Sequence, residues 1–141
     1  MALDPQSPTE IARFIRECGR GVVATVTSNG HPEAAMVGLV TLNDGTILFN
    51  SFSSSRKIAN LLAHPRIALV VGVDGAVTVQ LEGYATVTEG ETRARFAAEY
   101  ERQSPGSRAA SDTMSLVVVR PRWLRVYDTS QEPPVVAEAS W

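Results

Sequence analysis

Short turn signals divide this chain into a series of apolar runs, and this pattern constrains the fold more than any other feature. Asn29-Gly30 is a hairpin signal, and Asn43-Asp44-Gly45 and Asp74-Gly75 each separate two further runs. The runs cover 21–28, 32–42, 46–50, 66–73, 76–87 and 114–119, and a seventh segment, 123–127, follows the interruption at Pro121. They are rich in Val, Ile, Leu and Thr, which suit a pleated surface. Strands joined by such short turns predict an antiparallel meander.

Three segments with helical spacing lie between or before the strands. Residues 7–10 and 88–91 have the composition of capping boxes, and Ser55 precedes an apolar stripe that ends at His64-Pro65. Gly83 inside a strand predicts a bulge or a barrel bend. Alternating strand–helix–strand units, which would indicate a doubly wound parallel sheet, do not occur. The sequence therefore predicts a mainly β (α+β) fold, a six- to seven-stranded antiparallel barrel with about three short helices.

The length of 141 residues is that of one domain. We therefore expect 1–141 to form a single unit, with an irregular tail over 129–141 that contains Pro133-Pro134. The formal net charge of −2 gives no overall attraction to nucleic acid or to an anionic membrane surface. A single cysteine and an N-terminus without a leader pattern predict a cytoplasmic protein.

Candidate metal ligands and nucleophiles are few. The two histidines, His31 and His64, belong to no metal-binding motif, and we expect surface roles for both. Cys18 lies on the apolar face of the first predicted helix, where a buried, inert thiol is expected. The sequence contains no nucleophile elbow, Walker loop or dinucleotide-binding glycine motif. No residue is therefore assigned a catalytic role, and no metal site is predicted.

The segment Ser53-Ser54-Ser55-Arg56-Lys57 has the composition of an anion site. It follows a predicted strand and opens a predicted helix, so that hydroxyls, free backbone N–H groups and two cations converge. A phosphate dianion requires these groups. The same spacing also fits an ordinary serine-capped helix with a solvated Arg-Lys pair. The spacing alone leaves both interpretations open.

Four segments also occur in an order typical of one known family. They are Val23-Ala24-Thr25-Val26 through Asn29-Gly30-His31-Pro32, then Gly45 to Ser51 with Ser55-Arg56-Lys57, then Asn60-Leu61 with His64 to Val70, and finally Leu81-Glu82-Gly83-Tyr84-Ala85. Together they resemble the pyridoxamine 5'-phosphate oxidase-like family, the FMN-binding split barrels. The resemblance runs from Ile11 to Asp128. It implies a split barrel that forms a homodimer with two flavin sites at the interface.

The resemblance also implies a set of cofactor contacts. The flavin ring is expected on the backbone of Ala35, Met36, Val37 and Gly38. Asn50 and Ser51 are expected at the ribityl chain or phosphate, and Ser55, Arg56 and Lys57 at the phosphate. Thr78 and Gln80 are expected to approach the ring from the partner subunit. Trp123 is expected in the core or an interface rather than beside the flavin.

The chain departs from the family's named enzyme at two places. Its end lacks the Arg-x-His-Asp-Arg segment with which that oxidase binds its substrate's phosphate, and Ala35 stands where the oxidase has an arginine for the flavin phosphate. The resemblance therefore implies an FMN-dependent oxidoreductase that acts on a different substrate, which the sequence does not identify. Two alternatives stay open. One is a reductase that uses the deazaflavin coenzyme F-420, which the change at Ala35 mildly favours, and the other is a non-enzymatic flavin- or haem-binding or stress protein.

Overall fold

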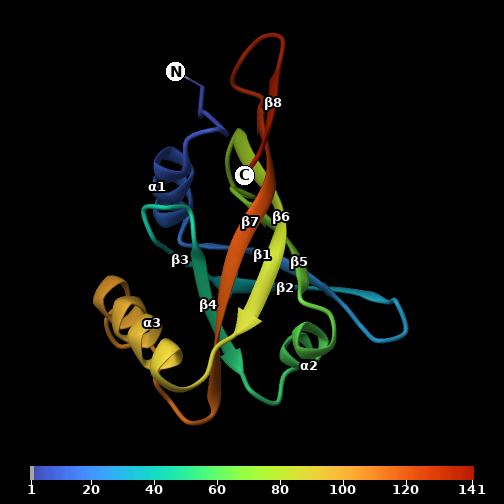
Figure 1. The fold of residues 1–141 in the computed structure, drawn as a ribbon. Coiled ribbons are helices and arrows are strands. Elements are labelled where there is room, and N and C mark those ends of the chain that lie inside the picture. Colours follow the sequence, from blue (N-terminus) through green and yellow to red (C-terminus); the bar gives the residue numbers. More distant parts are fainter. Residues whose placement is uncertain (1) are drawn as a thin grey trace.

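A single curled sheet with three flanking helices forms the structure, a computed structural model that describes residues 2–141 (Figure 1). The helices are α1 (Pro8–Cys18), α2 (Arg56–Ala63) and α3 (Gly90–Gln103). The strands are β1 (Arg20–Val26), β2 (Pro32–Gly38), β3 (Val40–Thr41), β4 (Ile47–Phe52), β5 (Arg66–Val71), β6 (Val77–Val87), β7 (Met114–Asp128) and β8 (Val135–Ser140). Their order is β2-β1-β5-β6-β7-β4-β3, every pairing is antiparallel, and β8 pairs with β7. The predicted mainly β fold, an antiparallel split barrel with about three short helices, is confirmed, as a half-barrel sheet of eight strands where six or seven were expected.

The eight strands include one that the sequence does not predict. The tail 129–141 was expected to be irregular, but β8 pairs with β7 from Asp128↔Val135 to Trp123↔Ser140. That expectation is wrong because β4 covers only the first half of β7, up to Val119, and leaves the edge of its second half free for another strand. The expected interruption at Pro121 is also absent, since β7 runs continuously through it.

Gly83 marks the bend of the long β6–β7 hairpin, as its position in a strand pattern predicts. The pairing register shifts between Glu82 and Gly83. A Cβ atom at Gly83 would overlap the backbone carbonyl of Arg120, so the two strands approach too closely there for any side chain. The glycine thus lets the hairpin curl across the barrel.

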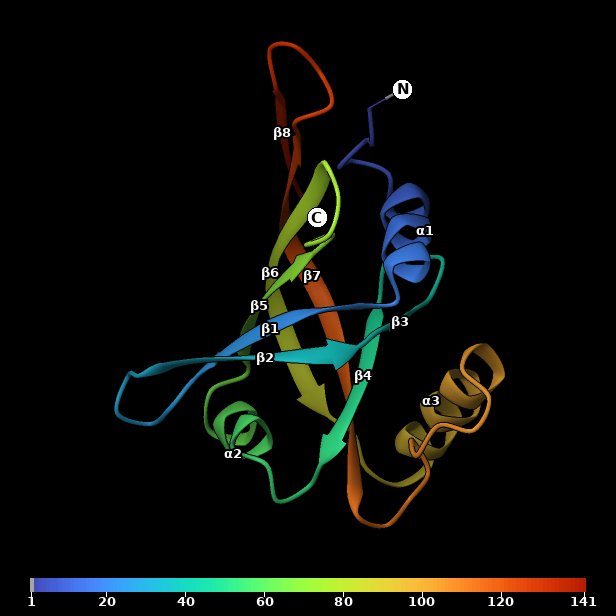
Figure 2. The same ribbon diagram turned by 180° about the vertical axis from the view of Figure 1, so that it is seen from behind.

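The main core fills the inside of the curled sheet. Two helices contribute to this core, through Ile11 and Ile15 of α1 and through Ile58 and Leu61 of α2. A smaller core cluster lies under α3 and joins that helix to β4 and β7. Figures 1 and 2 show α1 and α3 on the side of β3 and β4, with α2 at the far end near β5 and β2. Within residues 2–141, none of the helices has both the length and the apolar character that crossing a bilayer requires.

Two local expectations at helix ends are wrong. Cys18 is exposed, because burial on its face of α1 ends at Ile15 and the chain turns away at Gly19, which has φ 74°. The first capping box is present, with the Glu10 N–H donating to Ser7 Oγ at 3.2 Å. The second is not, because the Thr88 hydroxyl donates instead to the carbonyl of Leu116 at 2.7 Å.

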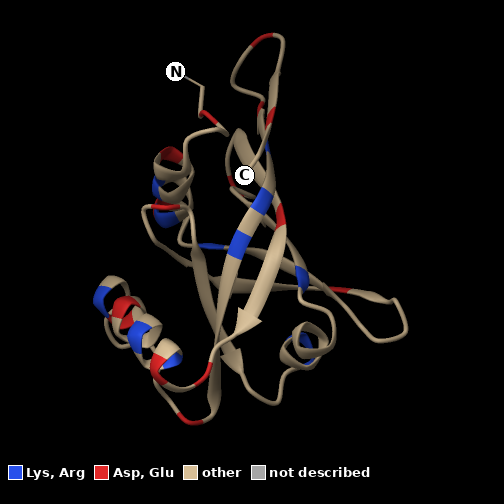
Figure 3. Cartoon of the chain, in the orientation of Figure 1, with Lys and Arg blue, Asp and Glu red and all other residues tan. Residues whose placement is uncertain are grey.

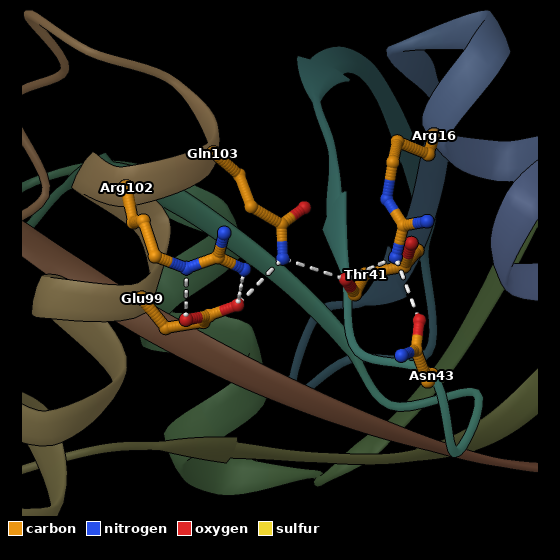
Figure 4. Close-up of polar contacts among 6 residues, drawn as sticks. All are labelled: Arg16, Thr41, Asn43, Glu99, Arg102 and Gln103. Atoms are coloured by element: carbon orange, nitrogen blue, oxygen red, sulfur yellow. Dashed lines mark hydrogen bonds and ion pairs between the residues drawn. The ribbon is translucent and has the colours of Figure 1, made fainter.

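A polar bridge ties α1 and α3 to β3 (Figure 4). Arg16 Nη2 and Gln103 Nε2 both donate to the carbonyl oxygen of Thr41, at 3.2 and 2.8 Å. Glu99 accepts hydrogen bonds from Arg102 and Gln103. These contacts lower the pKa of its carboxyl to about 2, and the contact with Arg102 has the largest effect. The bridge holds α3 beside the short strand β3.

Candidate functional site

The first turn of α2 presents free backbone amides beside two cations. Ser55 is the N-cap residue, but its side chain accepts no hydrogen bond from the helix. The amide of Ala59 donates to the carbonyl of Ser55 at 3.4 Å, so the N–H groups of 56–58 precede the helical ladder. Arg56 and Lys57 add positive charge at the positive end of the helix dipole. This arrangement attracts an anion.

Two hydroxyls and an ammonium group meet next to this helix start. Ser51 Oγ lies 3.0 Å from Ser55 Oγ and accepts a hydrogen bond from Lys57 Nζ at 3.1 Å. The pairing Ser51↔Ser115 between β4 and β7 fixes the end of β4 beneath the helix start. Three of the predicted phosphate ligands, Ser51, Ser55 and Lys57, therefore form one polar cluster.

A cavity of about 280 Å³ opens between the β1–β2 hairpin and the start of α2, and we call it the α2 cavity. Its lining residues are Val23, Thr25, Glu33, Ala34, Ala35, Arg56 and Lys57. Figure 3 shows the basic positions of α2 near an acidic position of β2. The cavity brings Ala35 next to Arg56 and Lys57, three residues that the resemblance assigns to the cofactor. Their role as cofactor ligands stays a prediction.

Glu33 contributes a carboxylate to the same cavity. It forms an ion pair with Arg56, whose side chain is 81% exposed, whereas that of Glu33 is 23% exposed. Glu33 also accepts a hydrogen bond at 2.8 Å from Asn60 Nδ2, which donates at 3.0 Å to Thr25 Oγ1 as well. Asn60 and Thr25 are buried. One polar chain thus links α2, β2 and β1.

Glu33, Asn60 and Thr25 are not among the residues predicted for the site, although two simple signals in the sequence point to Glu33 and Asn60. Glu33 lies two residues before Ala35, so both side chains project from the same face of β2. Asn60 lies four residues after Arg56, so both lie on one side of α2. Combining strand and helix periodicity around the predicted phosphate site would have selected them.

The remaining predicted residues of β2 and β4 lie outside the α2 cavity. Met36 is 48% exposed on the opposite face of β2. Val37 is buried in the main core, and Gly38 is exposed. Asn50 is half-buried on β4, opposite Leu116 of β7. Met36, Val37 and Gly38 follow Ala35 directly along β2, whereas Asn50 precedes Ser51 on β4.

Thr78 and Gln80 lie on the outer face of the sheet, away from the α2 cavity. Their strand neighbours define an outer-face row, which runs from Met36 through Val22 and Val70 to Gln80, with Thr78 opposite Tyr127. Met36, Val70 and Tyr127 are 48%, 38% and 42% exposed. Residues directly opposite in antiparallel strands share a face. The outer face therefore combines exposed apolar side chains with the two residues expected to act across a dimer.

Trp123 lines a different cavity, of about 350 Å³, on the outer face. Arg66 and Arg122 line it too, each with its guanidinium carbon 5.8 Å from the centre of the Tyr84 ring. Trp123 is half-buried and does not line the α2 cavity. Among residues 2–141, His, Cys, Asp and Glu side chains form no group of three that could hold a metal ion.

These features define an antiparallel half-barrel with two hydroxyls and two cations at the turn between β4 and α2. The sequence model of the pyridoxamine 5'-phosphate oxidase family matches residues 7–128. The chain therefore belongs to the pyridoxamine 5'-phosphate oxidase family. A search of curated proteins finds no significant match.

Solved structures share this fold at low sequence identity. A pyridoxamine 5'-phosphate oxidase-related, FMN-binding protein from Nostoc punctiforme is 13% identical, with a TM-score of 0.66, over 93% of this chain and 92% of that one. HutZ, the haem storage protein from Vibrio cholerae, is 18% identical, with a TM-score of 0.70, over 86% and 92%. General stress protein 26 from Bacillus anthracis is 18% identical, with a TM-score of 0.66, over 92% and 95%. One fold thus serves several functions, and the site must decide among them.

Proposed function

We propose that this chain binds the phosphate of a flavin coenzyme at the start of α2 and acts as a flavin-dependent oxidoreductase. The α2 cavity carries this proposal, since it joins Ala35 of β2 to Arg56 and Lys57 beside uncapped helix amides and the Ser51 and Ser55 hydroxyls. Charged donors and a helix N-terminus are what a phosphate group needs. Family membership and the FMN-binding relative from Nostoc punctiforme support the same ligand class.

The chain's own residues supply binding and orientation. Lys57, Ser51 and Ser55 hold one side of the phosphate, and Arg56 holds the solvent side, where its side chain is largely exposed. Asn50 lies next to Ser51, toward the ribityl chain, and the backbone of residues 35–38 supports the ring. A bound flavin supplies the redox chemistry, by exchanging hydride with a small substrate.

We also propose that the active form is a homodimer. A cavity of about 280 Å³ lies just below the range of roughly 300–1,000 Å³ for ligand pockets, so a whole flavin needs further walls. The outer face offers a surface for a second copy, because Met36, Val70 and Tyr127 are exposed there. In such a dimer, Thr78 and Gln80 of the partner subunit would contact the flavin ring.

The lining of the α2 cavity bears on the choice between the alternative cofactors. Ala35 supplies no positive charge to the phosphate, and the carboxylate of Glu33 lowers the net positive charge, which favours the deazaflavin coenzyme F-420 over FMN. A haem needs an axial ligand, most often histidine. His31 and His64 are both exposed, and neither lines the α2 cavity. The geometry therefore favours a flavin-type ligand over the haem that HutZ stores.

A spectrum and a titration test the proposal. The purified protein is examined for flavin or haem absorption, and it is then titrated with FMN, coenzyme F-420, haem and riboflavin, with fluorescence or absorbance as the readout. Tighter binding of the phosphate-bearing flavins than of riboflavin is expected. Haem binding alone, or no flavin binding up to roughly millimolar concentration, would contradict the proposal.

A further inference from the structure

The acidic side chain in the α2 cavity affects which kind of phosphate the site prefers. We propose that Glu33 is a specificity-determining residue that adjusts the site to a phosphodiester, which carries one negative charge, rather than to the dianion of a phosphomonoester such as FMN. The inference rests on the proposed function, because it concerns the same cavity and the same ligand class.

Glu33 is held in the cavity by contacts from two elements. Its carboxylate is ion-paired with Arg56 and accepts a hydrogen bond from Asn60 Nδ2 at 2.8 Å. Asn60 is itself buried and anchored to the Thr25 hydroxyl at 3.0 Å. The hydrogen bond from Asn60 does not depend on Arg56, and a movement of Asn60 would break its bonds to both Thr25 and Glu33. The Glu33 carboxylate therefore stays near the phosphate position when Arg56 turns to a ligand.

The charges that line the cavity explain the preference. Arg56 and Lys57 contribute two positive charges and Glu33 one negative charge, which leaves a single positive charge. Arg56 keeps further N–H donors while it is paired with Glu33, because a guanidinium has five. The site therefore retains hydrogen-bond donors for phosphate oxygens, but its net charge matches that of a monoanion.

The two candidate coenzymes differ in this charge. The phosphomonoester of FMN carries about −1.5 to −2 charges at pH 7. The phosphate of coenzyme F-420 is a diester and carries one. Repulsion from a fixed carboxylate is proportional to ligand charge, so Glu33 disfavours the monoester about twice as strongly, in free energy, as the diester. Ala35 adds no cation that would compensate.

The test replaces the carboxylate without removing its hydrogen-bond acceptor. Glu33→Gln keeps an oxygen for Asn60 Nδ2 and removes the charge. Dissociation constants are measured by flavin fluorescence for FMN, for the methyl phosphodiester of FMN and for riboflavin. The methyl ester differs from FMN by one methyl group and about one charge, so the two ligands form a matched pair. Coenzyme F-420 is measured in parallel, and thermal unfolding shows whether the variant folds.

We expect the affinity of Glu33→Gln for FMN to rise about tenfold and that for the methyl ester about threefold, as a unit charge about 6 Å away in a water-like dielectric would produce. Riboflavin binding should not change. The control Glu89→Gln removes an exposed carboxylate at the start of α3, outside the α2 cavity, and should leave all four affinities unchanged.

Three outcomes would overturn the inference. Weaker binding of both phosphate ligands by Glu33→Gln would show that the carboxylate positions Arg56. An equal change for FMN and its methyl ester, or no change for either, would show that Glu33 does not distinguish ligand charge. Binding of no phosphate ligand by either protein would remove the proposed function as well. A wild-type protein that binds FMN and a variant without the expected shift would remove only the inference.

Discussion

The carboxylate of Glu33 on β2 is ion-paired with the guanidinium of Arg56 in the first turn of α2. The residue predicted to hold a phosphate is thus already in contact with an anion of its own chain. Lys57 makes no such pair in the described structure and donates instead to Ser51 Oγ at 3.1 Å. The two adjacent cations therefore play different parts: Lys57 belongs to the hydroxyl cluster, and Arg56 is shared between Glu33 and a ligand.

Removal of both cations should abolish the preference for phosphate. The double variant Arg56→Ala/Lys57→Ala should weaken FMN binding by about 2–4 kcal/mol, because each charge-assisted hydrogen bond contributes about 1.5–3 kcal/mol and the two overlap. Riboflavin binding, measured by the same fluorescence titration, should change little. The matched control Arg66→Ala/Arg122→Ala removes two cations from the outer-face cavity. Equal losses in both double variants would argue against a phosphate site at α2.

A charge on the outer face should prevent dimer formation. Val70 is 38% exposed in the row that joins Met36 to Gln80, and Val70→Glu places an unpaired carboxylate in the proposed interface. Analytical ultracentrifugation should then show a monomer for the variant and a dimer for the wild-type protein. Leu62→Glu is the control, since Leu62 is 69% exposed on α2 and lies away from that row. A dimer that tolerates Val70→Glu would place the interface elsewhere.

Loss of the Asn60 side-chain amide should destabilise the α2 cavity. Asn60→Leu removes the hydrogen bonds to Thr25 Oγ1 and Glu33 Oε1 and leaves a buried hydroxyl and a carboxylate with one partner fewer. We expect the free energy of unfolding to fall by about 1–3 kcal/mol. Urea denaturation measures this change. A decrease smaller than about 0.5 kcal/mol would mean that water replaces the hydrogen bonds of the amide.

The stability that Glu99 contributes should disappear in acid. Its pKa falls from 4.5 to about 2 on folding, so the contribution is present above about pH 4.5 and is lost as the pH falls toward 2. Because the pair with Arg102 is near the surface, we expect only about 0.5–1 kcal/mol. Urea unfolding of wild type and Glu99→Gln should therefore differ at pH 7 and converge near pH 2. A difference that persists at pH 2 would assign the effect to packing.

The last residue should stabilise the fold. Trp141 Nε1 donates to the carbonyl of Pro5 at 2.9 Å, and the indole ring lies where a side chain at Gly45 would otherwise be. Trp141→Ala should lower the free energy of unfolding by about 1–3 kcal/mol. Val136→Ala, on the exposed side of β8, should cost less than about 0.5 kcal/mol. Equal small effects would show that the C-terminal contacts are dispensable.

Much of the fold follows from local patterns. The turn Asn29-Gly30 and the alternating runs on either side of it predict the β1–β2 hairpin, and Gly83 predicts the bulge of β6. These predictions succeed because side-chain period and turn geometry depend on neighbouring residues only. The same is true of Ser51 to Lys57 as a strand-to-helix turn.

Other features depend on elements far apart in the chain. The strand β8 forms because β7 has a free edge beyond the end of β4, and no property of residues 135–140 shows this. The exposure of Cys18 likewise depends on where the core ends rather than on helical spacing. Local propensity is weak compared with the pairing and burial that tertiary contacts provide.

By itself, the sequence determined that the chain has a strand-to-helix turn with Ser55, Arg56 and Lys57 within a half-barrel of known family type. Only the tertiary structure decided the charge of that site. The α2 cavity brings Glu33 from β2 against Arg56 and anchors it through Asn60 and Thr25. Coulomb interactions depend on distance in space, and residues from three elements come within a few ångströms of one another only once the hairpin packs on the helix.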